Sequence, residues 1–294
     1  MDRKKFLKVL SSIPASGFTT KLNDLKQITS SLPATGIMPV FFLGHGSPMN
    51  ALDDNPFVKG WKTATRFISR PKAILCISAH WETDGTFVTA MEQPRTIHDF
   101  GGFPQDLFDV QYPAPGSPEL AKETANMITK TNVGLDDKWG LDHGCWSLLK
   151  QCYPAADFPV VQLSLDYSRP ALYHYELAKE LAALRKKGVL IIGSGNLVHN
   201  LRLIAWEHIE EPEYGFDWAL EADAKMKKLI LAGDHQQLID YKMLGKAFDL
   251  AIPTPEHYLP LLYVLALKEE QEQVTIFNDK AVMGSLTMTS LKIA

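Results

Sequence analysis

The chain has 294 residues, of which 46% are hydrophobic, and its formal net charge is −4. This length allows a single large core, and the nearly balanced charge leaves no extended positive surface of the kind that follows nucleic acid. We therefore expect no nucleic-acid partner. The apolar runs are far shorter than the roughly 20 residues that cross a bilayer, and the three cysteines contain no CxxC pair. We expect no integral membrane segment, and a reducing cytoplasmic location fits the cysteine usage.

Residues 1–36 precede the first strongly apolar run and are polar and helix-prone. We interpret them as an N-terminal extension, followed by one folded domain over residues 37–294. The basic residues Arg3 and Lys4 resemble a degraded twin-arginine leader, in which lysine replaces the second arginine. The apolar part of this leader is short and is interrupted by Ser11, Ser12 and Pro14. A periplasmic location is the alternative if this segment acts as a leader.

The first two predicted strands are the apolar runs at residues 40–43 and 73–78. Such runs indicate strands that are buried on both faces, as in a parallel sheet. A long segment rich in proline, glycine and aromatic residues follows at 96–118. A long irregular loop inside a domain is typically functional. Four aromatic side chains of this loop form either core packing or a wall for a flat substrate; they are Phe100, Phe103, Phe108 and Tyr112.

Two further buried strands are predicted at residues 160–165 and 189–192. Between them Leu177, Leu181 and Leu184 recur at helical spacing, and Gly188 follows a basic run in the manner of a helix stop. Polar and apolar residues alternate at 285–289, which predicts a half-exposed edge strand that closes the sheet. Together these elements predict a single α/β domain with a largely parallel central sheet flanked by helices.

Three histidines follow predicted strands at the point where each strand ends. His45 and His80 come two residues after the runs 40–43 and 73–78, and His199 follows the last run through a glycine-rich turn. In open α/β sheets, ligands bind in the crevice outside the carboxyl ends of the strands. Neutral imidazole is a good ligand for iron(II) or zinc. The three side chains are therefore placed to converge on one cation.

Two more histidines stand in turn-like or helix-opening contexts, His143 in LDHGCW and His257 in PTPEHYLP. By spacing alone, all five histidines are equally consistent with a metal site and with hydrogen-bonded structural positions. We interpret the histidines in helical or charged surroundings as surface residues; these are His174, His208 and His235.

Other motifs are weaker. The segment GSGNLV has two of the three glycines of a dinucleotide fingerprint, and Ser47 in GHGSP lacks the GxSxG pattern of a hydrolase nucleophile. Cys145 lies near His143, where it is either a small buried residue or a nucleophile.

Several sequence blocks occur in order from about residue 38 to the C-terminus: FFLGHGSPMNAL, ISAHWET, TIHDFGGFP, YPAPGSPELA, LDHGCWSLL, VVQLSLD, GSGNLVHNL and TPEHYLPLLYVLAL. With these blocks the chain resembles the class III extradiol ring-cleavage dioxygenases, in particular the 4,5-DOPA dioxygenase group related to the catalytic subunit of protocatechuate 4,5-dioxygenase. The resemblance implies that His45, His80 and His257 hold one metal ion. It places His199 beside the metal, as a further ligand or as the acid/base, and His143 against the bound substrate.

The resemblance implies that oxygen is inserted into a catechol such as 4,5-DOPA to give a ring-opened semialdehyde. His199 would accept a catechol proton, and His143 would steady or protonate the developing oxyanion. Iron(II) is expected for turnover, although an all-histidine set also suits zinc. Many iron(II) oxygenases use two histidines and a carboxylate, so Glu256 is the fallback third ligand. The alternatives are a zinc-dependent hydrolase on the same scaffold and a non-catalytic metal-binding interaction protein.

Overall fold

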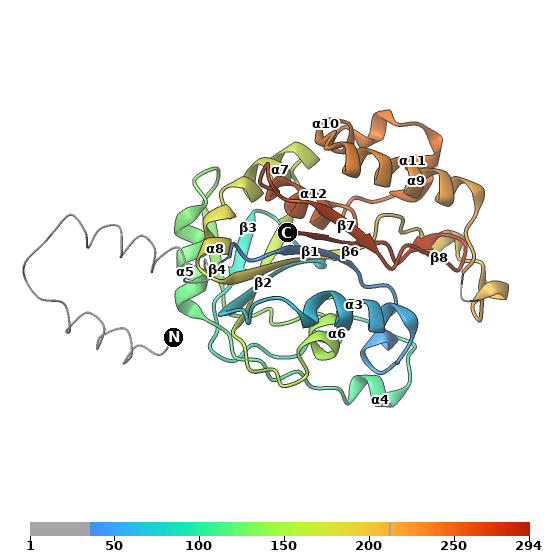
Figure 1. Cartoon of the computed structure of the whole chain (residues 1–294). Helices are drawn as coiled ribbons and strands as arrows, with labels where there is room; N and C mark the ends of the chain where they lie inside the picture. Colours follow the sequence, from blue (N-terminus) through green and yellow to red (C-terminus); the bar gives the residue numbers. More distant parts are fainter. Residues whose placement is uncertain (1–35, 212) are drawn as a thin grey trace, which may run out of the picture. The chain divides into compact units, whose positions relative to one another are not determined.

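An eight-stranded sheet forms the centre of the structure, a computed structural model that describes residues 36–211 and 213–294 (Figure 1). Its strand order is β4-β3-β5-β2-β6-β1-β10-β7, and β8 and β9 pair in a separate small sheet. The strands are β1 (Val40–Gly44), β2 (Ala73–Thr83), β3 (Thr86–Thr89), β4 (Val133–Asp136), β5 (Val160–Asp166), β6 (Val189–Gly195), β7 (Val274–Phe277), β8 (Ala281–Val282), β9 (Leu286–Thr287) and β10 (Ser290–Ile293).

The four inner strands β5, β2, β6 and β1 run parallel to one another. They are the four apolar runs of the sequence, so the predicted strands are confirmed. Antiparallel pairing occurs toward the two edges, where β10 joins β1 to β7 and β3 pairs with β5. The central sheet is therefore largely parallel, as predicted.

Helices cover both faces of the sheet (Figure 1). They are α3 (Pro56–Arg66), α4 (Gln105–Phe108), α5 (Pro118–Met127), α6 (His143–Cys152), α7 (Ala171–Lys179), α8 (Ala182–Lys186), α9 (Asp217–Ala232), α10 (His235–Ile239), α11 (Lys246–Ala251) and α12 (Leu259–Ala266). Successive strand residues point to opposite faces of the sheet. Val40 and Phe42 therefore belong to one hydrophobic cluster, which includes residues of α7, α9 and α12. Phe41 and Leu43 belong to the other, which includes residues of α3 and α6.

The helix predicted between β5 and β6 forms as two short helices, α7 and α8. Leu177, Leu181 and Leu184 are fully buried against the sheet, as their spacing predicted. Gly188 follows α8 with a φ of 89°, a left-handed conformation that glycine adopts without strain. The predicted helix stop is therefore confirmed.

The predicted edge strand at 285–289 is wrong in two respects. Only Leu286–Thr287 forms a strand, and it pairs with β8 outside the main sheet. All five residues are buried. Hydroxyl groups of the polar residues find internal partners: Ser285 donates to the carbonyl oxygen of Asn200 and Thr289 to the carboxylate of Asp223, each at 2.8 Å. Polar residues at these positions therefore did not indicate exposure to solvent.

His174 was interpreted as a surface residue, and this is also wrong. Its side chain is fully buried, with Nδ1 3.1 Å from the hydroxyl oxygen of Tyr263. His174 lies three residues before Leu177, so it shares the core-facing side of α7. His208 and His235 are partly buried.

Residues 1–35 lie outside the described residues, so the leader-like extension and the domain boundary after residue 36 stay predictions. In the part of the chain that the structure describes, no helix combines the length and the apolar character needed to cross a membrane.

Candidate metal centre

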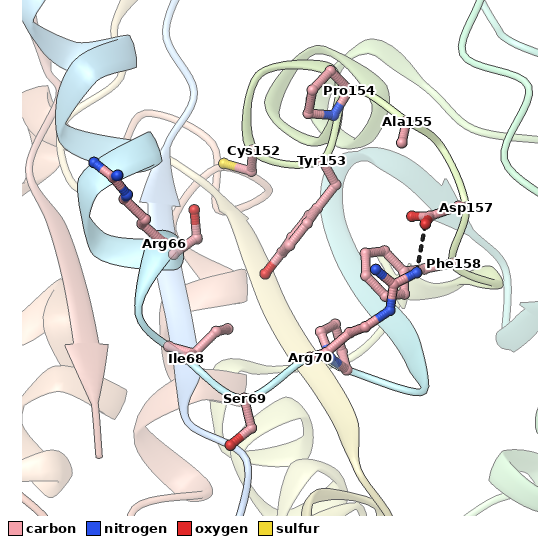
Figure 2. Close-up of a pocket in the computed structure, with 12 residues that line it drawn as sticks. Arg66, Ile68, Ser69, Arg70, Cys152, Tyr153, Pro154, Ala155, Asp157 and Phe158 are labelled. Carbon is pink, nitrogen blue, oxygen red and sulfur yellow. Dashed lines mark hydrogen bonds and ion pairs between the residues drawn. The ribbon is translucent and has the colours of Figure 1, made fainter.

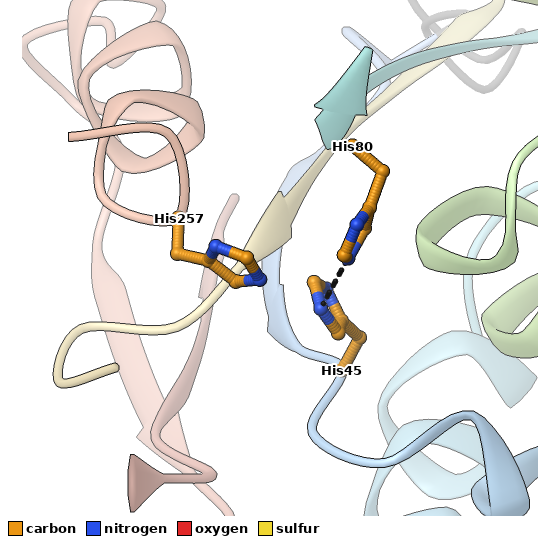
Figure 3. Close-up of side chains that lie close together, drawn as sticks. All are labelled: His45, His80 and His257. Atoms are coloured by element: carbon orange, nitrogen blue, oxygen red, sulfur yellow. Dashed lines mark hydrogen bonds between the residues drawn. The ribbon is translucent and has the colours of Figure 1, made fainter. Parts of the chain in front are cut away.

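Three histidines from distant parts of the sequence converge at one end of the inner strands (Figure 3). Nε2 of His45 is 3.1 Å from Nε2 of His80. The ring of His257 has its centroid 5.1 Å from that of His45 and 5.0 Å from that of His80. One potential donor atom from each of the three lies within 4.8 Å of the others, so this set could hold a metal ion.

The ends of the parallel strands place two of these side chains. His45 directly follows β1, and its backbone N–H donates to the carbonyl oxygen of Gly195 at the end of β6, at 3.1 Å. His80 was predicted to follow a strand, but it lies within β2, which continues to Thr83. At His80 the pairing of β2 with β6 has already ended and its register with β5 is shifted. The part of β2 that pairs with β6 therefore ends just before His80, where the strand end was predicted, although the backbone stays extended as far as Thr83.

His257 lies in the turn that precedes α12. Its backbone packs directly on Gly195, because a Cβ atom at that glycine would lie 2.1 Å from the carbonyl oxygen of His257. The same carbonyl oxygen accepts a hydrogen bond of 2.9 Å from the backbone N–H of Asn196. A residue without a side chain is thus required where the end of β6 meets the turn.

Hydrogen bonds leave a lone pair on the converging nitrogens. Ser194 Oγ donates to the carbonyl oxygen of Gly144 at 2.5 Å, so it accepts from Nδ1–H of His45 at 2.9 Å, and Nε2 of His45 carries the lone pair. Nδ1 of His257 is 3.3 Å from the carboxylate of Glu256, while its Nε2 is buried without a hydrogen-bond partner among the described residues. Coordination would satisfy this nitrogen, and two nitrogens each about 2.1 Å from one cation stand about 3.0–3.4 Å apart.

Burial keeps the three imidazoles in the neutral form that binds metals. It lowers the pKa of His45 and of His257 well below the usual value, and the charges of neighbouring histidines act in the same direction. Burial, followed by the charge of His143, lowers the pKa of His80 to about 3. The donor set therefore fits a mononuclear metal.

His143 stands beside this cluster as the first residue of α6, and its ring centroid is 3.9 Å from that of His80. The helix begins here because the Asp142 carboxylate accepts from the backbone N–H of Cys145 at 3.1 Å. The carboxylate of Asp99 accepts from the backbone N–H of His143 at 2.9 Å and lies 3.0 Å from Nδ1 of the same residue. Asp99 was not among the residues predicted from the sequence, although it lies in the TIHDFGGFP block of the predicted functional loop.

Asp142 was missed as well. Its fully buried carboxylate accepts from Ser78 Oγ and from Gln162 Nε2, each at 2.6 Å, so it ties α6 to β2 and β5. Burial raises the pKa of Asp142, and the charge of Asp99 raises it further. The signal for this residue was its position as a helix-capping aspartate directly before a candidate histidine.

His199 contacts the cluster by stacking. Its ring lies on that of His257 with centroids 3.4 Å apart and planes inclined by 6°. Its potential donor atom groups with those of Glu256 and His257, whereas the group containing His45 and His80 does not include it. Burial lowers the pKa of His199 to about 4.

Core packing is the role that the structure shows for the aromatic residues of the loop, and a wall for a flat substrate stays a prediction. Tyr112 belongs to the core, because it is buried and its hydroxyl donates to the carbonyl oxygen of Tyr153 at 3.0 Å. Phe100 is partly buried and meets His143 edge to face, with centroids 5.5 Å apart. Cys145 is fully buried and burial raises its pKa well above the usual value, which matches the small buried residue of the first interpretation rather than a nucleophile.

A hollow of about 360 Å³ lies at the opposite end of α6 (Figure 2). Its lining includes Arg66, Tyr153 and Phe158, and an ion pair of 2.5 Å joins Arg70 to Asp157 at its rim. None of the candidate histidines lines it. This hollow is therefore separate from the metal centre, and we assign it no function.

An α/β domain with histidines converging at the strand ends of its central sheet is a candidate metalloprotein. The family model described as the catalytic LigB subunit of aromatic ring-opening dioxygenase matches residues 39–290. The match spans most of the chain, so the protein belongs to this family, as the resemblance implied.

Among its relatives is the 4,5-DOPA dioxygenase extradiol of Escherichia coli (strain K12), which is 49% identical over 260 residues and covers 87% of this chain and 94% of the relative. The protein of the same name from Beta vulgaris is 36% identical over 271 residues, covering 87% of this chain and 96% of the relative. A crystal structure of an uncharacterized protein from Escherichia coli K12 aligns with a TM-score of 0.75 and 42% identity, over 87% of this chain and 100% of the other.

Proposed function

We propose that the protein opens the ring of a catechol beside its two hydroxyl groups by inserting both atoms of O2, with one metal ion held by His45, His80 and His257. The observation that carries this proposal is the convergence of three neutral imidazoles in a member of the ring-opening dioxygenase family. One of them, His257, has a buried Nε2 with no hydrogen-bond partner among the described residues. DOPA is the proposed substrate, because it appears in the names of two relatives.

Iron(II) is the metal we propose for turnover, and zinc is a second metal that the same imidazoles would bind. When bound, the metal ion would provide a common point at which catechol and oxygen are ordered and coupled electronically. The chain itself would provide orientation and proton transfer. His143 would contact the catechol oxygens, and Phe100 would form a wall against the flat ring.

His199 is proposed as the base that accepts a catechol proton rather than as a fourth ligand. An imidazole coordinates through a lone pair in the plane of its ring. Because the rings of His199 and His257 are nearly parallel and 3.4 Å apart, a metal in the plane of one ring lies well outside the plane of the other. Stacking therefore favours proton transfer over coordination for His199.

Reconstitution with iron(II) or zinc under nitrogen, followed by addition of DOPA and then of air, tests the proposed reaction. The expected result is a yellow product that forms only with iron(II) and only after air is admitted, with one O2 consumed per DOPA. Conversion without oxygen would instead support the zinc hydrolase. Tight metal binding without turnover of any catechol would support the non-catalytic alternative.

The role of His199 is tested separately with the variant His199→Ala. If His199 is a base, its removal keeps all three ligands in place. Metal content should then match that of the unmodified protein, while ring cleavage falls by about 10²- to 10⁴-fold. Loss of the metal from this variant would make His199 a ligand.

We also propose a cytoplasmic location, because the cysteines of the described residues are free thiols and a reducing compartment keeps them so. Fractionation of cells that produce the full chain tests this, and recovery from the periplasm would identify residues 1–36 as a leader.

A further inference from the structure

Asp99 holds His143 from two directions. One carboxylate oxygen accepts from the backbone N–H of His143 at 2.9 Å, and the other lies 3.0 Å from its ring Nδ1. The second oxygen is also 3.5 Å from Nδ1 of His80, so one carboxylate faces a candidate ligand and a candidate acid/base together. The Asp99 side chain is only 17% exposed, which limits its exchange with water.

This contact selects one tautomer of His143. An ionised carboxylate only accepts hydrogen bonds, so Nδ1 of His143 must carry the hydrogen. Nε2 is then the nitrogen left for substrate, and among the described residues it has no hydrogen-bond partner. Phe100, the next residue after Asp99, packs edge to face on the same imidazole and restricts its rotation.

We propose that Asp99 is a positioning residue that fixes the tautomer and ring orientation of His143, so that Nε2 of His143 meets the bound catechol. The proposal rests on the proposed ring-cleavage function for the identity of that substrate. The selection of the tautomer does not depend on the reaction, because it follows from the hydrogen bonds of the protein itself.

The variant Asp99→Asn separates positioning from a general structural role. Its amide oxygen can still accept from the backbone N–H of His143, but its NH₂ group now faces Nδ1. Because an NH₂ group only donates, Nδ1 must become the acceptor, and the hydrogen moves to Nε2. Folding should therefore be unchanged while the wrong nitrogen of His143 carries the hydrogen. The same NH₂ group also lies near Nδ1 of His80, 3.5 Å from the original oxygen, so rates are compared per bound metal ion. A fixed wrong tautomer is expected to lower kcat by about 10²- to 10⁴-fold with little change in KM.

The first test uses ¹⁵N-labelled histidine and NMR of the metal-free protein, with His143 assigned from the spectrum of His143→Gln. We expect hydrogen on Nδ1 of His143 in the unmodified protein and on Nε2 in Asp99→Asn. The same tautomer in both proteins, or hydrogen on Nε2 in the unmodified protein, would overturn the proposal. This measurement needs no turnover, so its result is independent of whether the protein cleaves catechols.

The second test is a double-mutant cycle in ring cleavage with iron(II). If Asp99 acts through His143, adding Asp99→Asn to His143→Ala should lower kcat no more than about threefold further, because the group it positions is already gone. Asp99→Glu, which keeps the carboxylate, should recover part of the rate lost in Asp99→Asn. Additive losses in the cycle would contradict a role through His143, whereas absence of turnover in the unmodified protein would refute the proposed function instead.

Discussion

Replacement of Gly195 by alanine should displace the proposed metal ligand His257 without altering any donor atom. The new Cβ atom would lie 2.1 Å from the carbonyl oxygen of His257, about 1.3 Å short of ordinary contact at 3.4 Å. The turn that carries His257 must therefore move by about 1 Å, which also breaks the hydrogen bond from Asn196. Overpacking costs about 1–3 kcal/mol and the lost hydrogen bond about 1 kcal/mol, so we expect a destabilisation of about 2–4 kcal/mol.

The effect on the metal should be larger than the effect on folding. Metal–ligand distances tolerate deviations of about 0.2 Å, so a shift of about 1 Å removes His257 from the donor set. We expect metal affinity, measured by competition with a chelator, to fall by at least about 10²-fold, and the Tm of the metal-free protein to fall by about 5–15 °C. Gly101→Ala is the matched control, because nothing lies within 4 Å of a Cβ atom there. Equal affinities in the two variants would refute the assignment of His257 as a ligand placed by β6.

Three further predictions address other parts of the molecule. Ser194→Ala removes the acceptor for Nδ1–H of His45, so chelator competition should show metal affinity about 10- to 100-fold weaker. His143→Ala should retain its metal while ring cleavage falls by about 10²- to 10⁴-fold, and unchanged rates would return the residue to a structural role. Glu272→Gln leaves the buried Arg185 without its counter-charge and should cost about 3 kcal/mol at pH 7 in urea unfolding. Burial alone would raise the pKa of Glu272, but hydrogen bonds and charge from Arg185 lower it below 4.5. The stabilisation that ionised Glu272 provides is thus complete above pH 4.5. It disappears as the pH falls through the folded-state pKa of Glu272, and there the variant should be as stable as the unmodified protein.

The inner sheet could be predicted because its residues leave little choice of structure. Short runs such as 189–192 are apolar without alternation, and in the structure both faces of these strands are covered by helices. The position of His45 followed from the same pattern, since a side chain after a parallel strand must lie at its carboxyl edge. The convergence of His257 with this edge could not be derived from spacing, because it depends on how α12 packs; the family resemblance supplied it.

Other features depend on partners that are distant in sequence. Asp99 meets His143 across 44 residues, and no local rule links a loop carboxylate to a helix start so far along the chain. The burial of 285–289 depends on acceptors near residues 200 and 223 that satisfy its hydroxyl groups. His174 is different, because its spacing from Leu177 already placed it on the buried side of the helix. There, the polarity of histidine was given more weight than its position.

The close packing around Gly144 limits how this site can evolve. A Cβ atom at residue 144 would lie 2.5 Å from Ser78 Oγ and 2.8 Å from Cδ2 of His80, and the carbonyl oxygen of Gly144 holds Ser194. A mutation that shifts the start of α6 to admit a bulkier catechol would therefore also disturb the proposed ligands His45 and His80, so its benefit would depend on simultaneous changes elsewhere. Because the effects of these mutations depend on one another, we do not expect a single mutation at the start of α6 to broaden the substrate range. Changes in substrate range, in nature or in directed evolution, should instead accumulate at aromatic positions of the loop 96–118. One such position is Phe103, whose ring packs edge to face on that of Phe100 with centroids 5.4 Å apart.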